Sequence, residues 1–233
     1  MAAGVRLQNF RVRLLSDFGS RFMKTIMCFG DSNTHGYPSR PLQTGATRYP
    51  FEQRWTSVAQ RLLGAGFHLI PEGLNGRTSV HDDPIEGMHK NGARMLLGLL
   101  ETHTPLDAVV IMLGTNDLKA RFGLGAADIA AGIGTLLQII QAFSMGQGAI
   151  KVLVVCPPPI LEIGAFKEMF AGGANKSNIM AAYYEEIALM HGARFLDAGK
   201  VVVSSTGDGI HFDASEQEKL GKAIAKELSA MLA

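Results

Sequence analysis

Five short apolar runs, each rich in β-branched residues, alternate along this chain with longer segments of helical period. The runs typical of strands are Thr25 to Phe29, Phe67 to Pro71, Ala108 to Leu113, Lys151 to Cys156 and Ala193 to Leu196. The helical segments are Arg54 to Leu63, Asn91 to Thr102, Ala126 to Phe143, Asn175 to His191 and Ala214 to Leu232. Strands that alternate with helices pair in parallel and carry helices on both faces. The pattern therefore predicts an α/β fold with three layers around a five-stranded parallel sheet.

Length and composition favour one globular domain. The chain has 233 residues, 47% hydrophobic and 18% charged, which is enough apolar material for a sizeable core. No linker rich in Pro, Gly or Ser divides the sequence, so we predict one domain over residues 23–233. At the start of the last predicted helix, Asp213 is followed three residues later by Glu216. That spacing predicts a capping box.

Charge and cysteine usage narrow the expected partners. The net charge is +1 with both signs scattered, so we expect no nucleic-acid partner. No apolar run in the sequence approaches the roughly 20 residues of a membrane span, so we expect no membrane partner. Cys28 and Cys156 lie in predicted core strands, where a free thiol behaves as a small hydrophobe. With no metal-ligand spacing in the sequence, we expect no metal and a reducing, cytoplasmic location.

Residues 1–22 differ in pattern from the rest. Asp17 is their only acidic residue, and the apolar positions are interrupted by Arg6, Arg11, Arg13 and Arg21. A secretory signal has a continuous apolar stretch and a cleavage site, and neither is present. An organelle-targeting segment, a helix that docks on the domain or a partner, and a stretch upstream of a true start at Met23 stay open. We favour a structural or artefactual extension over targeting.

Polar motifs follow four of the predicted strands. They occupy residues 30–33, 73–76, 114–117 and 208–211. In an open parallel sheet, ligands bind beyond the carboxyl ends of the strands, which meet at one edge. Each motif alone is an ordinary turn or helix cap. Their occurrence together predicts that they converge on one functional site.

Ser32, His211 and Asp208 have the chemistry of a catalytic triad. A serine hydroxyl becomes a strong nucleophile when an imidazole, whose ordinary pKa is about 6.5, removes its proton. Asp208 precedes His211 by three residues, close enough to hold one ring nitrogen and leave the other for Ser32. For the oxyanion of the tetrahedral intermediate, the candidate donors are the backbone N–H groups of Ser32 and Gly76 and the side-chain amide of Asn116.

These motifs resemble the four signature blocks of the SGNH, or GDSL-type, hydrolases, in that family's order. The resemblance covers residues 24–232. Similarity to the arylesterase and acyltransferase branch is carried by Arg54-Trp55, Glu72-Gly73-Leu74, Asp82-Asp83-Pro84, Ile111-Met112-Leu113, Pro157-Pro158-Pro159 and Asp197-Ala198-Gly199. It implies a flavodoxin-like three-layer sandwich and hydrolysis of short-chain acetyl or aryl esters through an acyl-enzyme, with acyl transfer to alcohols. It also implies no cofactor and a homo-oligomer. Asn33 departs from the family pattern, because it stands where the leucine of the GDSL name would be.

Five residues are candidates for the substrate pocket. Asn33 is polar and lies next to the proposed nucleophile. Trp55 is a candidate, although a core position at a helix start is the commoner role of tryptophan. The apolar stretch from residue 160 to 170 supplies Ile160, Phe166 and Phe170. That stretch is expected to line the pocket or to be buried against another subunit.

Other functions fit the sequence less well. An α/β-hydrolase requires a G-x-S-x-G elbow, and nucleotide-binding folds require G-x-G-x-x-G or a P-loop, and the sequence has none of these. A carbohydrate O-acetyl esterase is the first alternative, because it would use the same triad with a different pocket. A non-catalytic small-molecule binding protein on the same fold is the alternative of another class.

Overall fold

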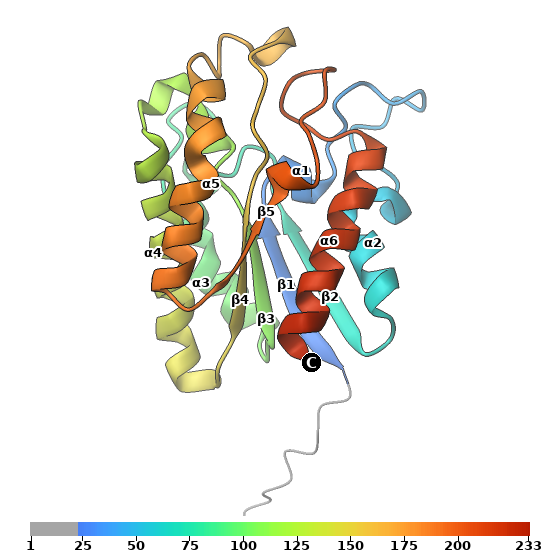
Figure 1. The fold of residues 1–233 in the computed structure, drawn as a ribbon, viewed down its shortest axis with the longest axis vertical. Helices are drawn as coiled ribbons and strands as arrows, with labels where there is room; N and C mark the ends of the chain where they lie inside the picture. Colours follow the sequence, from blue (N-terminus) through green and yellow to red (C-terminus); the bar gives the residue numbers. More distant parts are fainter. Residues whose placement is uncertain (1–22) are drawn as a thin grey trace, which may run out of the picture.

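A five-stranded parallel sheet forms the centre of the molecule (Figure 1). The computed structural model describes residues 23–233, so the interpretations of residues 1–22 lie outside the described residues. The strands are β1 (Lys24–Gly30), β2 (Phe67–Gly73), β3 (Ala108–Met112), β4 (Lys151–Cys156) and β5 (Arg194–Asp197). Their order is β2-β1-β3-β4-β5, and every neighbouring pair is parallel. All five predicted strands are confirmed, each within two residues at either end.

Helices cover both faces of this sheet and complete the predicted three layers. They are α1 (Ser32–His35), α2 (Trp55–Leu63), α3 (Gly92–His103), α4 (Ala126–Gln147), α5 (Gly173–Met190) and α6 (Ala214–Leu232). Helices α2 and α6 pack on one face, and α3, α4 and α5 pack on the other. The five predicted helices are confirmed, although α4 continues four residues past Phe143. The four-residue α1 was not predicted.

Each face of the sheet has its own apolar core. Successive side chains of a strand point to opposite faces. In β3, Val109 and Ile111 therefore join the core beneath α3, α4 and α5, whereas Ala108, Val110 and Met112 join the core beneath α2 and α6. Burial on both faces explains why the strands appear in the sequence as continuous apolar runs.

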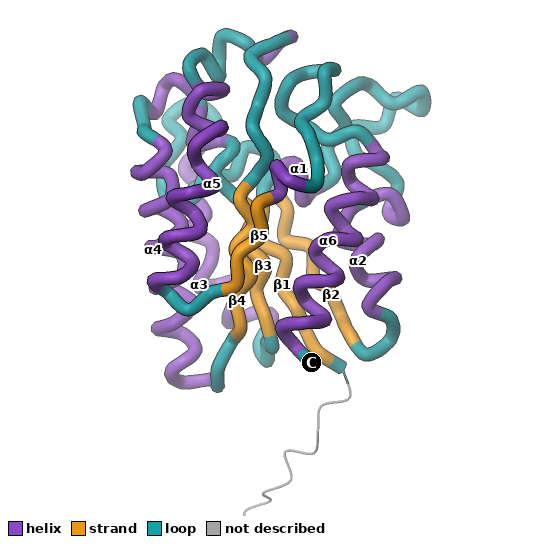
Figure 2. Tube along the Cα trace, in the orientation of Figure 1, coloured by secondary structure: helices purple, strands orange, loops and turns teal. Residues whose placement is uncertain are grey.

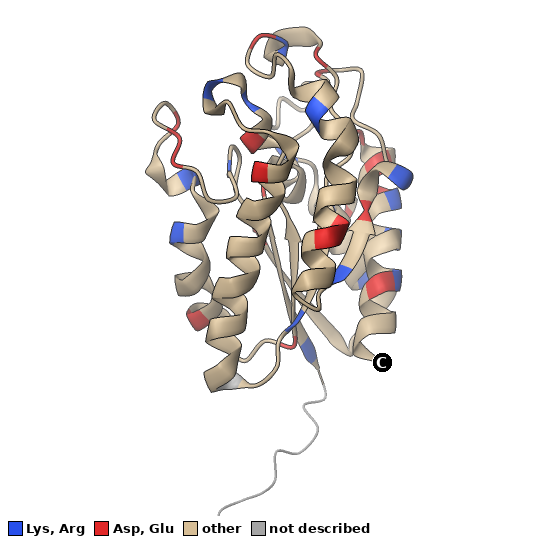
Figure 3. Ribbon diagram, turned by 60° about the vertical axis from the view of Figure 1, so that its left-hand side comes forward, with Lys and Arg blue, Asp and Glu red and all other residues tan. Residues whose placement is uncertain are grey.

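Helix α4 corrects one expectation drawn from the sequence. Its segment Ala126–Gly146 is long and apolar enough, by length and composition alone, to cross a membrane, whereas no such run was expected. Ile129, Ile133 and Leu136 on this helix are fully buried in the core. The face formed by α4 and α5 carries few charged residues (Figure 3). Packing against the sheet accounts for the apolar composition of α4.

Loops gather beyond the carboxyl ends of the strands (Figure 2). One of them leads into α6 and is fixed by Asp213, whose carboxylate accepts hydrogen bonds from the hydroxyls of Ser39 at 2.5 Å and Ser205 at 2.9 Å. Glu216 accepts a hydrogen bond from the Val203 N–H at 3.1 Å. The predicted capping box is therefore wrong, because Asp213 makes no side-chain cap to α6. Both carboxylates tie the preceding loop to the helix instead.

Candidate active site

Ser32 occupies the first position of α1, directly beyond the end of β1. The chain turns at Asp31, whose carboxylate accepts a hydrogen bond from the Asn33 N–H at 2.9 Å. Glycine is required at residue 30, because a Cβ atom on Gly30 would lie 2.1 Å from the hydroxyl of Thr34. As the first N–H of a helix, the Ser32 N–H has no acceptor within α1. It is therefore available to a ligand.

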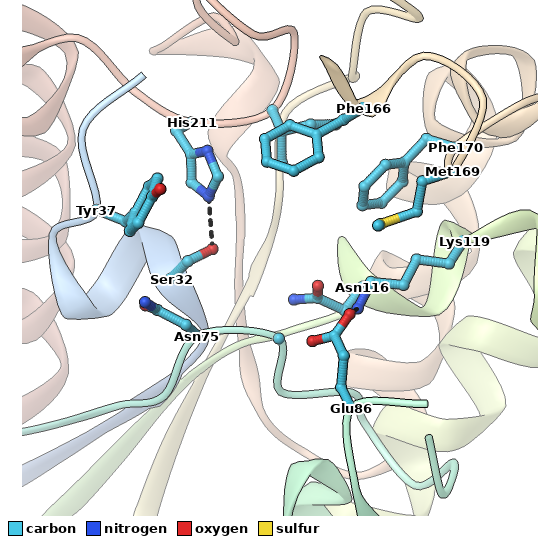
Figure 4. A pocket seen from close by; sticks show the side chains of 12 residues that line it. Ser32, Tyr37, Asn75, Glu86, Asn116, Lys119, Phe166, Met169, Phe170 and His211 are labelled. Atoms are coloured by element: carbon cyan, nitrogen blue, oxygen red, sulfur yellow. Dashed lines mark hydrogen bonds and ion pairs between the residues drawn. The ribbon is translucent and has the colours of Figure 1, made fainter. Parts of the chain in front are cut away.

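His211 and Asp208 lie in one turn beyond β5 and complete a hydrogen-bonded series with Ser32. The Nε2 atom of His211 lies 2.9 Å from Ser32 Oγ (Figure 4). Its Nδ1 atom lies 2.6 Å from Asp208 Oδ2. The carboxylate accepts the Nδ1 proton, which leaves Nε2 to accept the serine proton. Gly209 makes this turn with a φ of 83°. The Leu161 N–H donates to its carbonyl at 2.8 Å.

Asp208 is held in its ionised form. Burial alone would raise the pKa of this carboxyl, but the hydrogen bond and charge of His211 and the backbone N–H groups of Ile210 and His211 lower it below its ordinary value. Both N–H groups donate to Asp208 Oδ1 at 2.9 Å. Three donors on one carboxylate stabilise the negative charge that orients the imidazole.

The three predicted oxyanion donors, Ser32, Gly76 and Asn116, line one pocket together with His211. Gly76 lies in a turn with a φ of 79°, and its N–H has no acceptor among residues 23–233. The amide nitrogen of Asn116 donates to the Arg77 carbonyl at 3.1 Å and lies 3.5 Å from Asp31 Oδ2. The second contact is at the long limit of a hydrogen bond, so an oxyanion at normal distance would be the better acceptor.

The pocket has a volume of about 150 Å³ and one apolar side. Phe166, Met169 and Phe170 line that side, opposite Asn116 in Figure 4. The ring of Phe166 lies 5.8 Å from the His211 ring, and the ring of Tyr37 lies 4.7 Å from it. Two aromatic rings therefore flank the imidazole and restrict its movement.

Comparison with known proteins decides the family. The family model for GDSL-like lipases and acylhydrolases matches residues 28–217. The chain belongs to this family. As a member of the GDSL-like acylhydrolases it is a hydrolase of carboxylic esters, as the resemblance of its motifs implied. Among curated proteins there is no match to this sequence.

Solved structures agree with this assignment. A carbohydrate acetylesterase from Sinorhizobium meliloti is 40% identical over 89% of this chain and 99% of its own, with a TM-score of 0.83. The aryl esterase of M. smegmatis is 41% identical over 89% of this chain and 99% of its own, with a TM-score of 0.82. A lipase/acylhydrolase from Enterococcus faecalis, at 21% identity and a TM-score of 0.61 over 89% of this chain and 96% of its own, shares the fold. The predicted SGNH fold is confirmed.

In this acylhydrolase Glu86 and Lys119 form a charged wall that lines the pocket on a side away from Ser32 and His211. The Lys119 ammonium is only 2% exposed and pairs with Glu86 Oε1, and it lies 3.5 Å from Asp83 Oδ2. The Arg121 guanidinium lies 2.7 Å from Glu86 Oε1 and 3.1 Å from Asp83 Oδ2. Two cations therefore face two carboxylates, and the formal charge of the cluster is zero.

A second carboxyl group of the acylhydrolase, that of Asp31, lies close to Ser32 and to the predicted oxyanion donor Asn116. Burial raises the pKa of Asp31 to about 6, although the Asn33 N–H and the charges of His211 and Arg77 oppose that effect. Arg77 is buried as well, and burial lowers its pKa to about 10 despite the nearby carboxylates. The hydrogen bonds and opposite charges around Asp31 and Arg77 do not fully offset the loss of hydration of either group. Ionisation of these two groups therefore lowers the stability of the folded protein.

Three predicted pocket residues lie elsewhere. Asn33 is 2% exposed, and its amide donates to the Ile210 carbonyl at 3.3 Å, which joins the first and last motifs from behind. Trp55 is fully buried in the core beneath α2 and α6, where the apolar face of α2 places it. Ile160 is buried in the other core, where its N–H donates a hydrogen bond to Ser177 Oγ of α5 at 3.1 Å. Only Phe166 and Phe170 of the five candidates line the pocket.

Several residues that line the pocket were not among the predicted site residues. They are Tyr37, Asn75, Glu86, Lys119, Met169 and Ile210. Asn75 and Ile210 lie inside the signature motifs, and Tyr37 follows the first motif in the same loop. Their proximity in sequence to the predicted site residues could therefore have identified these three. Met169 lies in the apolar stretch already singled out. Glu86 and Lys119 carry no signal in the sequence, because exposed loops commonly contain both residue types.

Proposed function

We propose that this chain hydrolyses short-chain acyl esters, acetyl esters above all, through an acyl-enzyme on Ser32. The observation that carries this proposal is the hydrogen-bonded series from Asp208 through His211 to Ser32, which opens onto a small pocket. The named esterases among the similar structures support it.

The first half-reaction follows from these positions. Ser32 Oγ attacks the ester carbonyl while His211 Nε2 takes the hydroxyl proton, and the imidazolium that forms is stabilised by Asp208. The carbonyl oxygen becomes an oxyanion that accepts hydrogen bonds from the N–H groups of Ser32 and Gly76 and from the amide of Asn116. Collapse of this intermediate expels the alcohol, which receives its proton from His211, and leaves the acyl group on Ser32.

The second half-reaction reverses these roles with water. His211 Nε2 removes a proton from a water molecule, which attacks the acyl-enzyme carbonyl, and the same donors hold the new oxyanion. Collapse releases the carboxylic acid and returns the proton to Ser32. An alcohol in place of water would give a new ester. We propose acyl transfer to alcohols as an accompanying activity, because the apolar rings beside the imidazole favour an organic acceptor.

The size of the pocket supports a small acyl group. Pockets that bury drug-sized ligands commonly have volumes of about 300 to 1,000 Å³. The volume here is about 150 Å³, and Phe170 and Lys119 line the pocket on the side away from His211. An acetyl group fits such a space, whereas an octanoyl chain would have to leave through the mouth.

Carbohydrate O-acetyl esters are the second candidate substrates. The charged wall favours them, because Glu86 and Lys119 offer partners for hydroxyl groups that an aryl ester does not use. The M. smegmatis relative is an aryl esterase and the S. meliloti relative a carbohydrate acetylesterase, so similar chains bear both names.

We also propose that the protein is a homo-oligomer and cytoplasmic. In the loop that carries Phe166 and Phe170, Leu161 and Met169 are 38% and 37% exposed, and a partner subunit there would cover them. The buried thiols of Cys28 and Cys156 support a reducing compartment. Light scattering checks the first proposal, and a monomer would contradict it. That the protein binds neither nucleic acid nor membrane stays a prediction.

Hydrolysis of p-nitrophenyl esters from acetate to decanoate tests the proposed function. We expect the highest kcat/KM for acetate and no turnover above background for Ser32→Ala, with an unchanged melting temperature. A binding protein without activity would show no hydrolysis by the natural chain, and near-normal turnover by Ser32→Ala would exclude Ser32 as the nucleophile. Acetylated sugars in the same assay separate the two candidate substrate classes.

A further inference from the structure

Glu86 exposes one carboxylate oxygen to the pocket without a hydrogen-bond donor among the residues that the structure describes. Its Oε1 atom is held by Lys119 and Arg121. The Oε2 atom lies so close to Gly76 that a Cβ atom at that position would be 2.2 Å away. Because the Gly76 N–H is a proposed oxyanion donor, Glu86 Oε2 lies beside the place of the reacting carbonyl group.

A carboxylate in that place would oppose the reaction if its charge were not compensated, since negative charge develops on the nearby carbonyl oxygen. Lys119 and Arg121 supply the compensation, and Asp83 balances the second cation. The negative charge of Glu86 is thereby balanced, and Glu86 Oε2 remains as a hydrogen-bond acceptor. The side chain is 30% exposed, which leaves Oε2 accessible to a ligand.

An acceptor of this kind discriminates between ligands. An apolar group packed against Glu86 would displace water and give the carboxylate no donor, which is unfavourable. A hydroxyl group would replace the water with a charge-assisted hydrogen bond. A site built to bind a hydroxyl group rejects an analogue without that group strongly. An apolar pocket distinguishes ligands that differ by one methylene group much less.

On the basis of the esterase function proposed above, we infer that Glu86 is a specificity-determining residue that accepts a hydrogen bond from a hydroxyl group on the ester. The preferred substrates are then short esters with a hydroxyl a few bonds from the carbonyl carbon. That hydroxyl belongs to the alcohol or to the acyl group, and both present the same donor.

Two pairs of esters test this inference, and each pair exchanges one hydroxyl for a methyl group. On the alcohol side, 2-hydroxyethyl acetate is compared with propyl acetate. On the acyl side, ethyl glycolate is compared with ethyl propanoate. A hydroxyl also changes intrinsic reactivity, so the readout is the change in the kcat/KM ratio of a pair between the natural protein and Glu86→Gln.

We expect Glu86→Gln to lower the hydroxyl-to-methyl ratio by about tenfold in one of the two pairs, because the amide keeps a neutral acceptor and loses the charged one. The pair whose kcat/KM ratio falls shows whether Glu86 binds a hydroxyl on the alcohol side or on the acyl side of the ester. Glu168→Gln is the matched control, since it removes the same charge from an exposed side chain next to Met169. Its ratios should equal those of the natural protein.

Glu86→Asp guards against a failure of Glu86→Gln to fold. It keeps the charge that Lys119 and Arg121 require and withdraws the carboxylate by one methylene, so the same ratio should fall. Ratios unchanged in both Glu86 variants, or an equal fall in Glu168→Gln, would overturn the inference. If the natural protein hydrolysed none of the four esters, the esterase proposal would fail instead, and the two failures are thereby distinguishable.

Discussion

Two carboxyl groups close to Ser32 have opposite electrostatic environments. Asp208 accepts hydrogen bonds from the His211 ring and two backbone N–H groups, and its pKa lies below the ordinary value. Asp31 is completely buried and accepts one good hydrogen bond, from the Asn33 N–H, and its pKa rises to about 6. Both lie close to Ser32, so the depth of burial and the number of hydrogen-bond donors, and not the distance from the serine, decide which carboxyl group is readily ionised.

The difference separates two roles of negative charge in one site. In the proposed mechanism the charge on Asp208 is used in every turnover, because it stabilises the imidazolium of His211. The charge on Asp31 faces the side on which the oxyanion forms, where a negative group is a disadvantage. Because the pKa of Asp31 is raised to about 6, this carboxyl group is partly protonated near that pH, which reduces its repulsion of the oxyanion.

Removing the charge of Asp208 should have the largest effect. In Asp208→Asn the amide can donate to Nδ1, which favours the wrong tautomer of His211 and leaves no base for Ser32. We expect kcat to fall by about 10⁴-fold with the fold retained. Steady-state kinetics on p-nitrophenyl acetate measure this, with circular dichroism as the control. A loss below tenfold would mean that the two carboxyl groups do not differ in the way described.

The next largest effect should come from Asn116, which lies on the Asp31 side. Its amide is placed to contact the oxyanion and not the ground-state carbonyl, so Asn116→Ala should reduce kcat by about 10²- to 10³-fold and leave KM nearly unchanged. The two parameters are measured with the same ester. A tenfold rise in KM at constant kcat would instead identify Asn116 as a substrate-binding residue.

Asp31 should affect stability more than turnover. Because its folded-state pKa of about 6 lies above the ordinary 3.8, the folded protein holds a proton between these values that the unfolded chain has lost. The contribution of Asp31 to stability therefore falls as pH rises from about 4 to 6 and stays lower above that. Asp31→Asn should raise the free energy of unfolding at pH 8 by up to about 3 kcal/mol and change it little at pH 4.

Urea denaturation at the two pH values measures this difference. The asparagine oxygen can still accept from the Asn33 N–H, so the turn before Ser32 is preserved and kcat should fall far less than in Asp208→Asn. Equal changes in stability at pH 4 and pH 8 would show that the effect of Asp31 is not electrostatic.

A third carboxylate in the same region should have the smallest effect. Asp213 lies two residues after His211 and binds the hydroxyls of Ser39 and Ser205, but it does not contact the reacting groups. Asp213→Ala removes the acceptor of both hydroxyl protons and should lower the free energy of unfolding by about 1 to 2 kcal/mol, with kcat reduced only a few-fold. Thermal denaturation and kinetics check it. A loss of kcat comparable to that of Asp208→Asn would show that Asp213 shares in the triad.

The sequence predicted the convergence of the motifs because one geometric rule sufficed. Parallel strands place their carboxyl ends at one edge, so Ser32, Gly76, Asn116 and His211 had to meet there. The distance of 2.9 Å between Ser32 and His211 follows from that topology and from the tight turn at Gly209. The strands and helices could also be predicted, because the periodicity of apolar residues along the chain differs between the two.

The sequence could not predict which face a loop residue presents. Trp55 and Ile160 have the composition of pocket residues, but the helix face and the strand exit that carry them point into the cores. Glu86 and Lys119 have the composition of surface residues, and only the packing of two loops brings them together at the pocket. Such pairings depend on long-range contacts, for which local pattern holds no information.

The hydrogen bond between the Leu161 N–H and the Gly209 carbonyl has a consequence for how this enzyme can diversify. A side chain on Gly209 would lie 2.1 Å from the Leu161 carbonyl oxygen, so the segment leading to Phe166 and the turn carrying His211 touch backbone to backbone. A substitution that widens the aromatic side should therefore also shift His211, the proposed general base. New substrate preferences are therefore expected from changes at Asn75, Glu86 and Lys119, which line the pocket and lie outside both of these segments.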